Sequence, residues 1–332
     1  MNLLDMAMSR NSRIVAPLAG YPGVKLIGRS VREALSDPGV QLEVLRALEE
    51  RLQPDIVFTL LDLTVEAESM GLGVGFFEKQ PPSLVEQKLP KLERFYELGI
   101  PDPESATRMP VFLEVAEGLA ADESRLCGAF VTGPFTLLAQ LLGTEGLLER
   151  VKLGDPLTEP LGFATSVVGE YAAALAARVD IVVVVDPAAE ALKAHEFASL
   201  CRPYISGLAG IIRSSGAICL VHICGDVSHL LEELALTGAE GICLDSKINL
   251  PREVDKIPVN LVLVGNIDPK RIIQRGTVED VRWEVRRLLR HMDGVRNFIL
   301  STGCDVPADA PMRNLEAMME EARNWRPRSG RF

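Results

Sequence analysis

Long apolar runs and an excess of basic residues are both missing from this sequence. No stretch approaches the roughly 18 consecutive apolar residues of a membrane span, and the opening MNLLDMAMSR lacks the apolar core of a secretion signal. Lys and Arg total 35 against 46 Asp and Glu, for a formal net charge of −11. Because nucleic-acid binding depends on clustered Lys and Arg, this balance argues against a nucleic-acid partner. We expect a soluble, cytoplasmic protein with no membrane partner.

Cysteine is also sparse. Six cysteines at irregular spacing in 332 residues are too few for a disulfide scaffold and fit a reducing compartment. Free thiols are then available as metal ligands. Four of the six lie inside apolar or helical patterns and are expected to be core residues: Cys127, Cys201, Cys219 and Cys243.

Apolar β-branched runs alternate with amphipathic stretches along the chain, as is typical of parallel strands joined by helices. The predicted strands are Asp55–Leu61, Leu126–Val131, Asp180–Val185, Ala217–His222, Gly241–Leu244, Leu261–Val264 and Phe298–Ser301. The predicted helices are Gln41–Arg51, Pro134–Leu142, Glu159–Ala177, Ala194–Ser214, Val227–Leu236, Thr277–Met292 and Ala310–Trp325.

A linker rich in Gly, Ser or Pro is absent, and no G-x-G-x-x-G follows an early strand. A doubly wound open sheet is therefore the weaker interpretation, and we predict a single (β/α)8 TIM-barrel domain over residues 1–332, with an N-terminal helical extension. The eighth strand is expected around Ile14–Leu18. In such a barrel the chemistry belongs at the carboxyl ends of the strands.

Nitrogen and sulfur ligands gather at those ends. In H-I-C, His222 and Cys224 are alternate residues at a strand end, so they point to the same side, and Cys304 follows the last strand. These three ligands suit zinc and leave a fourth position open, as in catalytic sites. A lone Cys or His at a strand end is more often a packing residue, so spacing by itself leaves that possibility open.

Carboxylates follow the same strand ends. Asp245 and Glu68 are both candidates for an exchangeable fourth metal ligand. Asp226 is predicted either to orient His222 or to cap the next helix. Asp62 and Asp186 are candidates for substrate contact, although Asp at such positions also satisfies turn backbone.

Tyr21 lies in the turn Gly20–Gly23. This turn is predicted to shape the pocket mouth, which assigns Tyr21, with Asp226, to cofactor binding. An ordinary tight turn would fit the same residues. The remaining histidines, His195, His229 and His291, and the basic run Arg282–Arg290 are interpreted as surface or helix-end residues.

Several segments together carry a family resemblance. L-V-H-I-C-G-D at 220–226 and S-T-G-C-D-V-P at 301–307 resemble the zinc motif of methylcobamide:coenzyme M methyltransferases, a branch of the uroporphyrinogen decarboxylase superfamily. D-L-T-V-E-A-E-S-M-G at 62–71, V-T-G-P-F-T-L-L-A-Q at 131–140 and V-G-N-I-D-P at 264–269 are similar to further segments of that superfamily. The resemblance spans most of the chain.

Two departures separate the sequence from the parent decarboxylase. The decarboxylase needs cationic residues for the many carboxylates of its substrate, yet the region matching its Arg-rich M-R-Q-A-G-R motif reads A-P-L-A-G-Y-P-G at 16–23. Its G-H-G is replaced by Gly303-Cys304-Asp305. Asp62 matches the decarboxylase's essential Asp, so decarboxylation is kept as a competing activity.

The resemblance implies a Zn²⁺-dependent methyltransferase. A zinc-bound thiolate would attack the methyl group of a methylcorrinoid, presented by a corrinoid protein, and leave cob(I)alamin. The acceptor is expected to be a small thiol such as coenzyme M. Transfer to a folate and a non-catalytic docking or metal-storage module are competing hypotheses, and the sequence leaves the methyl donor and the oligomeric state open.

Overall fold

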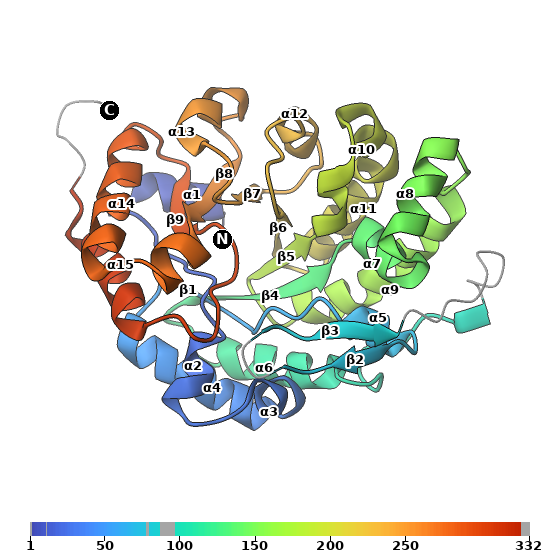
Figure 1. Cartoon of the computed structure of the whole chain (residues 1–332), viewed down its shortest axis with the longest axis horizontal. Coiled ribbons are helices and arrows are strands. Elements are labelled where there is room, and N and C mark those ends of the chain that lie inside the picture. Colours follow the sequence, from blue (N-terminus) through green and yellow to red (C-terminus); the bar gives the residue numbers. More distant parts are fainter. Residues whose placement is uncertain (1, 11, 78–79, 87–96, 327–332) are drawn as a thin grey trace.

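The computed structural model describes residues 2–10, 12–77, 80–86 and 97–326. Its main sheet holds seven parallel strands in the order β1-β4-β5-β6-β7-β8-β9, curled into an open barrel with helices around it (Figure 1). The strands are β1 (Ile56–Phe58), β4 (Leu126–Thr132), β5 (Ile181–Val185), β6 (Ile218–Ile223), β7 (Gly241–Leu244), β8 (Val262–Ile267) and β9 (Phe298–Thr302). All seven predicted strands are present, and the predicted TIM-barrel architecture is confirmed.

The segment around residues 14–18 closes the ring between β9 and β1. It pairs with β9 through one parallel bridge, between Val15 and Leu300. On the other side, the backbone amide of Asp55, just before β1, donates to the carbonyl of Val15 at 3.0 Å. The expected eighth strand therefore occupies its place in the barrel as a single bridge.

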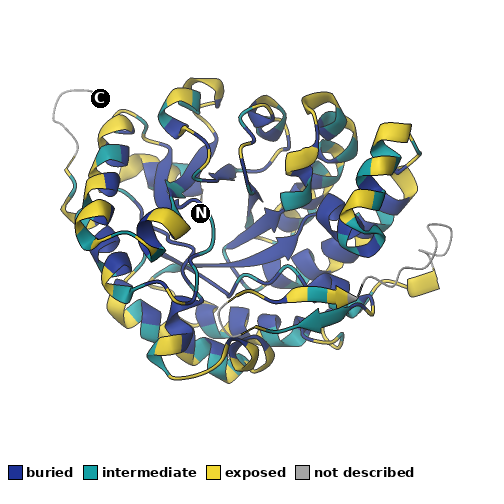
Figure 2. Ribbon diagram, viewed as in Figure 1, coloured by how far each residue is buried: buried dark blue, intermediate teal, exposed yellow. Residues whose placement is uncertain are grey.

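Two apolar cores follow from strand alternation, because successive side chains point to opposite faces of the sheet. One core fills the barrel and includes Phe58, Phe130 and Leu220. The larger core lies between the strands and the helices and includes Val182, Val221 and Phe135. Figure 2 shows the strands buried and the outer faces of the helices exposed. The first helix, α1 (Leu3–Ser9), contributes Leu3 and Ala7 to the inner core.

The predicted helices are confirmed at five places and corrected at two. α4 (Pro38–Leu52), α7 (Pro134–Leu142), α9 (Thr158–Ala176), α14 (Val278–His291) and α15 (Met312–Asn324) match within a few residues. The predicted helix 194–214 is two helices, α10 (Ala194–Leu200) and α11 (Arg202–Ser214). Pro203 cannot donate a backbone hydrogen bond, so a new helix begins there. The predicted helix 227–236 is helical only over α12 (Leu231–Ala235).

Other elements were not predicted. One is the hairpin of β2 (Gly73–Gly75) and β3 (Ser83–Glu86), which follows β1 and lies beside the barrel (Figure 1). The additional α-helices are α2 (Pro22–Leu26), α3 (Val31–Ser36), α5 (Val65–Ser69), α6 (Met109–Ala120), α8 (Thr144–Leu153) and α13 (Leu250–Glu253). Among the described residues, no helix combines the length and the apolar character needed to cross a membrane.

Candidate metal centre

Strand β6 carries two of the predicted ligands into the barrel. Leu220 belongs to the inner core and Val221 to the outer core. Alternation therefore turns His222 and Cys224 inward. His222 is 1% exposed. Cys224 stands just after the strand, before a turn at Gly225.

Cys304 joins them from the loop after β9. The sulfurs of Cys224 and Cys304 are 3.8 Å apart, and the sulfur of Cys224 lies 3.3 Å from Nε2 of His222. One ligand atom from each of the three residues lies within 4.8 Å of the other two. Two sulfurs bound to one tetrahedral zinc at about 2.3 Å each would be separated by roughly 3.8 Å. The donor set and its spacing thus fit a zinc ion.

The ring of His222 is oriented by the main chain. Its Nδ1 lies 3.0 Å from the carbonyl oxygen of Cys243, and a carbonyl only accepts, so Nδ1 carries the proton. Nε2 then keeps a lone pair on the side of Cys224 and Cys304. The predicted orienting residue, Asp226, instead accepts from the backbone amide and the hydroxyl of Ser228 in a local turn. The bond from the Ser228 amide is a capping contact at the start of the turn 227–230, whereas the helix predicted from Val227 begins only at Leu231.

The two candidates for a fourth ligand have different positions. Asp245 follows the inward-facing Cys243 by two residues, so it also faces the barrel, and its carboxylate accepts from the amide of Gly225 at 3.0 Å. Asp245 therefore lies next to the turn that carries Cys224. The carboxylate of Glu68 accepts from Nε of Arg108 at 2.7 Å. Neither carboxylate is within 4.8 Å of all three ligands.

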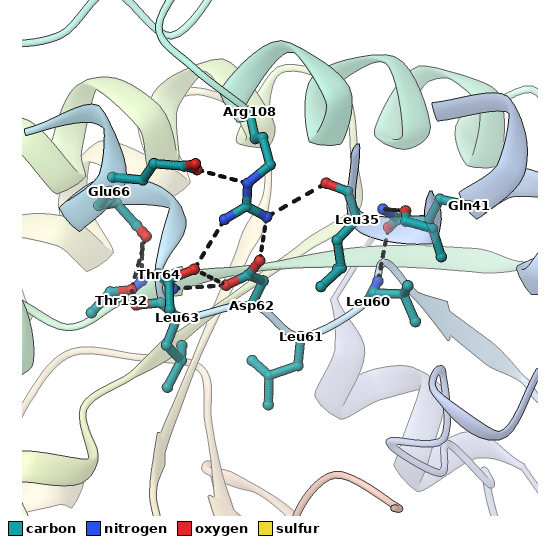
Figure 3. A network of polar contacts seen from close by, with 12 residues as sticks. Leu35, Gln41, Leu60, Leu61, Asp62, Leu63, Thr64, Glu66, Arg108 and Thr132 are labelled. Carbon is teal, nitrogen blue, oxygen red and sulfur yellow. Dashed lines mark hydrogen bonds and ion pairs between the residues drawn. The ribbon is translucent and has the colours of Figure 1, made fainter. Parts of the chain in front are cut away.

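Asp62 lies at the centre of a buried polar network (Figure 3). Its side chain is fully buried and accepts from Nη1 of Arg108 at 2.5 Å. Its other oxygen accepts from the amide of Thr64 at 2.8 Å and from the hydroxyl at 2.6 Å. Arg108 also bridges to Glu68, and its guanidinium lies over the ring of Phe76, the residue that follows β2 in the hairpin. The carboxylate expected to contact substrate is thus engaged by protein groups on both oxygens.

Asp186 is directed away from the barrel interior. Val185 belongs to the inner core, so the next residue faces the helix layer. There the carboxylate accepts from the amide of Thr136 at 2.7 Å, in the first turn of α7. Burial raises the pKa of Asp186 to about 6. The structure gives this residue a helix-capping contact rather than a place at the mouth.

Tyr21 is a buried anchor. It is 1% exposed, and its hydroxyl donates to the carbonyl of Leu61 at 2.6 Å. This contact ties the turn at 20–23 to the segment after β1. The role of Tyr21 in cofactor binding stays a prediction.

Sequence reasoning missed two charged residues beside Cys224. Glu190 lies on a short 3-10 helix, Pro187–Ala191, after β5, and its Oε1 accepts from the amide of Asp226 at 3.3 Å. Lys247, after β7, places its Nζ 3.8 Å from the same oxygen. A hydrogen bond with Cys304 is the main cause that lowers the pKa of Cys224; nearby Glu190 raises that pKa and Lys247 lowers it. Glu190 and Lys247 both follow predicted strands, and that position is the feature of the sequence that could have identified them.

The remaining histidines and cysteines agree with their predicted structural roles. Nε2 of His229 contacts the carbonyl of Leu192 at 2.9 Å, and Nδ1 of His291 contacts the carbonyl of Arg287 at 2.7 Å. His195 is exposed on α10. The four cysteines predicted to be core residues are buried: Cys127, Cys201, Cys219 and Cys243.

Known proteins with similar sequences include methyltransferases and decarboxylases. The chain is 27% identical over 274 residues to methylcobamide:CoM methyltransferase MtbA of Methanosarcina acetivorans, covering 80% of this chain and 78% of that protein. It is 25% identical to methylcobamide:CoM methyltransferase MtaA of Methanosarcina barkeri, covering 88% and 86%. It is 24% identical to the uroporphyrinogen decarboxylase of Methylococcus capsulatus, covering 93% and 91%.

The fold agrees with these similarities. The chain superposes on the structure of a methyltransferase from Methanosarcina mazei with a TM-score of 0.87, at 22% identity and 96% coverage of both chains. The family model for uroporphyrinogen decarboxylase (URO-D) matches residues 18–325. The chain therefore belongs to the uroporphyrinogen decarboxylase family.

Proposed function

We propose that this chain is a methyltransferase that moves a methyl group from a methylated corrinoid to a zinc-activated thiol. The observation that carries the proposal is the group of His222, Cys224 and Cys304, with ligand atoms 3.3 and 3.8 Å apart at the carboxyl ends of two barrel strands. The similarity of the chain to proteins named methylcobamide:CoM methyltransferases supports the same reaction.

Three protein ligands are the number typical of catalytic zinc sites, which keep a position open for substrate. His222 and the two cysteines would hold the ion. When bound, zinc stabilises the deprotonated form of a thiol at neutral pH, and the thiolate is the nucleophile.

The residues around the ligands prepare the site. The carbonyl of Cys243 holds the ring of His222 so that Nε2 is available as a ligand. Asp245 accepts from the amide of Gly225 and so braces the turn beside Cys224. Asp245 is also the better placed of the two candidates for an exchangeable fourth ligand, because Glu68 is paired with Arg108.

The transfer itself is a displacement at the methyl carbon. The carbon–sulfur bond forms as the cobalt–carbon bond breaks, both electrons of the broken bond stay on cobalt, and the thiol proton is released to solvent. Besides holding the zinc, the protein would align the two reactants at about 3–3.5 Å. A corrinoid protein is the expected partner, presenting the methyl group at the carboxyl ends of the strands, and the proposed location is the cytoplasm.

Decarboxylation of uroporphyrinogen is less well supported. Asp62, which matches the essential Asp of the decarboxylases, has both carboxylate oxygens engaged by Thr64 and Arg108. The side chain of Arg108 is 9% exposed and is itself neutralised by two carboxylates. That arginine is therefore not free to bind a substrate with many carboxylates.

The test combines metal analysis with turnover. Purified protein and Cys304→Ala are assayed for zinc content and for demethylation of methylcobalamin with 2-mercaptoethanesulfonate and with homocysteine, followed by the absorbance change of the corrinoid. Cys201→Ala is the matched control, because Cys201 is a buried cysteine outside the ligand group. We expect about one zinc per chain and thiol-dependent turnover in the wild type and the control, with both lost in Cys304→Ala. Protein that binds no zinc and transfers no methyl group to either thiol would refute the proposal.

A further inference from the structure

An ion pair of opposite charges stands beside the candidate metal ligands. Glu190 comes from the loop after β5 and Lys247 from the loop after β7, so they flank the end of β6, which lies between those strands. Both are rim residues of the kind that determine substrate choice in barrels. The proposed displacement at carbon uses neither of them.

Glu190 is placed close to Cys224 by the turn at Gly225. A Cβ on Gly225 would lie 1.8 Å from Oε1 of Glu190, so any other residue at this position would displace the carboxylate from where it lies. Gly225 also has a φ of 103°, which side-chain-bearing residues rarely adopt. The absence of a side chain at Gly225 therefore lets the carboxylate of Glu190 lie against the backbone next to Cys224.

The ion pair between Glu190 and Lys247 is long and exposed to solvent. Its closest atoms are 3.8 Å apart, with 65% of the Lys247 side chain and 43% of the Glu190 side chain exposed. Exposed pairs of this kind contribute little to stability. A ligand that carries both charges can replace the one loose contact by two, at small cost to the protein.

We propose that the acceptor thiol carries an α-amino-acid group, whose ammonium binds Glu190 and whose carboxylate binds Lys247. This inference rests on the proposed function only for the position of the thiol at the metal ligands. Local charge also disfavours a thiol with a purely anionic tail, because the carboxylates of Asp226, Asp245 and Glu190 lie on the side of the site where Lys247 supplies an ammonium.

The test measures binding and turnover with three thiols of different charge. Homocysteine is zwitterionic, 2-mercaptoethanol is neutral and 2-mercaptoethanesulfonate is anionic. Each is titrated calorimetrically into the zinc-loaded protein and assayed as acceptor with methylcobalamin. The variants are Glu190→Gln and Lys247→Met, and the control is Glu320→Gln, which removes a carboxylate from an exposed ion pair with Arg282. Zinc content is measured for each protein.

We expect the wild type and Glu320→Gln to bind homocysteine more tightly than the other two thiols. Glu190→Gln should weaken homocysteine binding and raise its KM by roughly 10- to 100-fold, the usual effect of losing a hydrogen bond to a charged group, with kcat nearly unchanged. Its affinity for 2-mercaptoethanol should stay within about twofold, and its zinc content should be normal. Lys247→Met should lose homocysteine affinity in the same way.

Two results would overturn the inference: preference of the wild type for the sulfonate, or an equal loss for all three thiols in Glu190→Gln. Calorimetry separates this outcome from failure of the proposed function. Zinc-loaded protein that binds homocysteine through Glu190 but demethylates no corrinoid would sustain the binding of an amino-acid thiol at Glu190 and Lys247 and would refute the methyl transfer.

Discussion

Glu66 offers a test of how the buried polar layer is built, through the dependence of stability on pH. It lies on α5, is fully buried, and accepts from the amide of Thr132 at 2.6 Å and from its hydroxyl at 2.8 Å (Figure 3). Burial is the main cause that raises the pKa of Glu66 from the ordinary 4.5 to about 7, and the bonds from Thr132 oppose that rise. The folded protein therefore holds a proton on Glu66 that the unfolded chain releases.

The direction in which stability changes with pH follows from this difference in pKa between the folded and unfolded chain. Because the folded-state pKa is raised, the stability that Glu66 contributes is fully present below pH 4.5 and is lost as pH rises through about 7. At about 1.4 kcal/mol per pH unit, the total loss is about 3 kcal/mol. Glu66→Gln abolishes this titration. Its amide oxygen can accept from the Thr132 amide, and its NH₂ can donate to the Thr132 hydroxyl, which can still donate to the carbonyl of Leu63.

The assay is urea unfolding of both proteins at pH 5 and pH 8. The free energy of unfolding of Glu66→Gln, relative to the wild type, should increase by about 2 to 3 kcal/mol between the two pH values. Glu43→Gln, an exposed position on α4, is the control and should show less than about 0.5 kcal/mol of change. If the curves of Glu66→Gln and wild type stay parallel across this range, burial does not raise the pKa of Glu66 and the reasoning is refuted.

Two further substitutions test other parts of the structure. Arg108→Met leaves the buried carboxylate of Asp62 without its cation and should lower the free energy of unfolding by about 3–5 kcal/mol. Adding Asp62→Asn should restore part of the lost stability. A double variant no more stable than Arg108→Met would contradict the ion-pair assignment. Gly225→Ala forces a side chain into a positive-φ position against Glu190, and should destabilise the protein by about 1–2 kcal/mol while weakening homocysteine binding as Glu190→Gln does. A Gly225→Ala protein with unchanged unfolding and unchanged thiol affinity would show that the carboxylate is not held there. Chemical denaturation and calorimetry measure both effects.

The grouping of the three candidate metal ligands was predictable because it depends on two simple rules. His222 and Cys224 share a face by the period of two along a strand, and Cys304 follows the strand that closure of the barrel brings round. The same period places Asp186 on the helix side, since its predecessor Val185 pairs with the inward-facing His222. Its position at a strand end suggested a place at the barrel mouth, but the alternation of side chains along β5 directs it toward the helices.

The partners of Asp62 could not be predicted in this way. Arg108 is 46 residues further along the chain and lies at the start of a helix, α6, that the apolar pattern did not reveal. Contacts of this kind depend on how irregular segments cross above the sheet. The periods of hydrophobic residues along strands and helices do not describe such segments. Glu190 was hidden for a similar reason, because its position over Gly225 arises from the path of a loop.

The single bridge at residue 15 has a consequence for the order in which the molecule can be assembled. The hydroxyl of Ser301 donates to the carbonyl of Ala16 across 285 residues of sequence, and Leu300 pairs with Val15 beside it. During synthesis, the amino-terminal segment must therefore wait for the last strand before the ring can close, and until then the growing sheet has two open edges. Contacts so distant in sequence form late and slowly. The nascent chain is consequently most exposed to wrong pairing just before β9 and the loop with Cys304 are made. The ring of strands and the group of candidate metal ligands are therefore completed together.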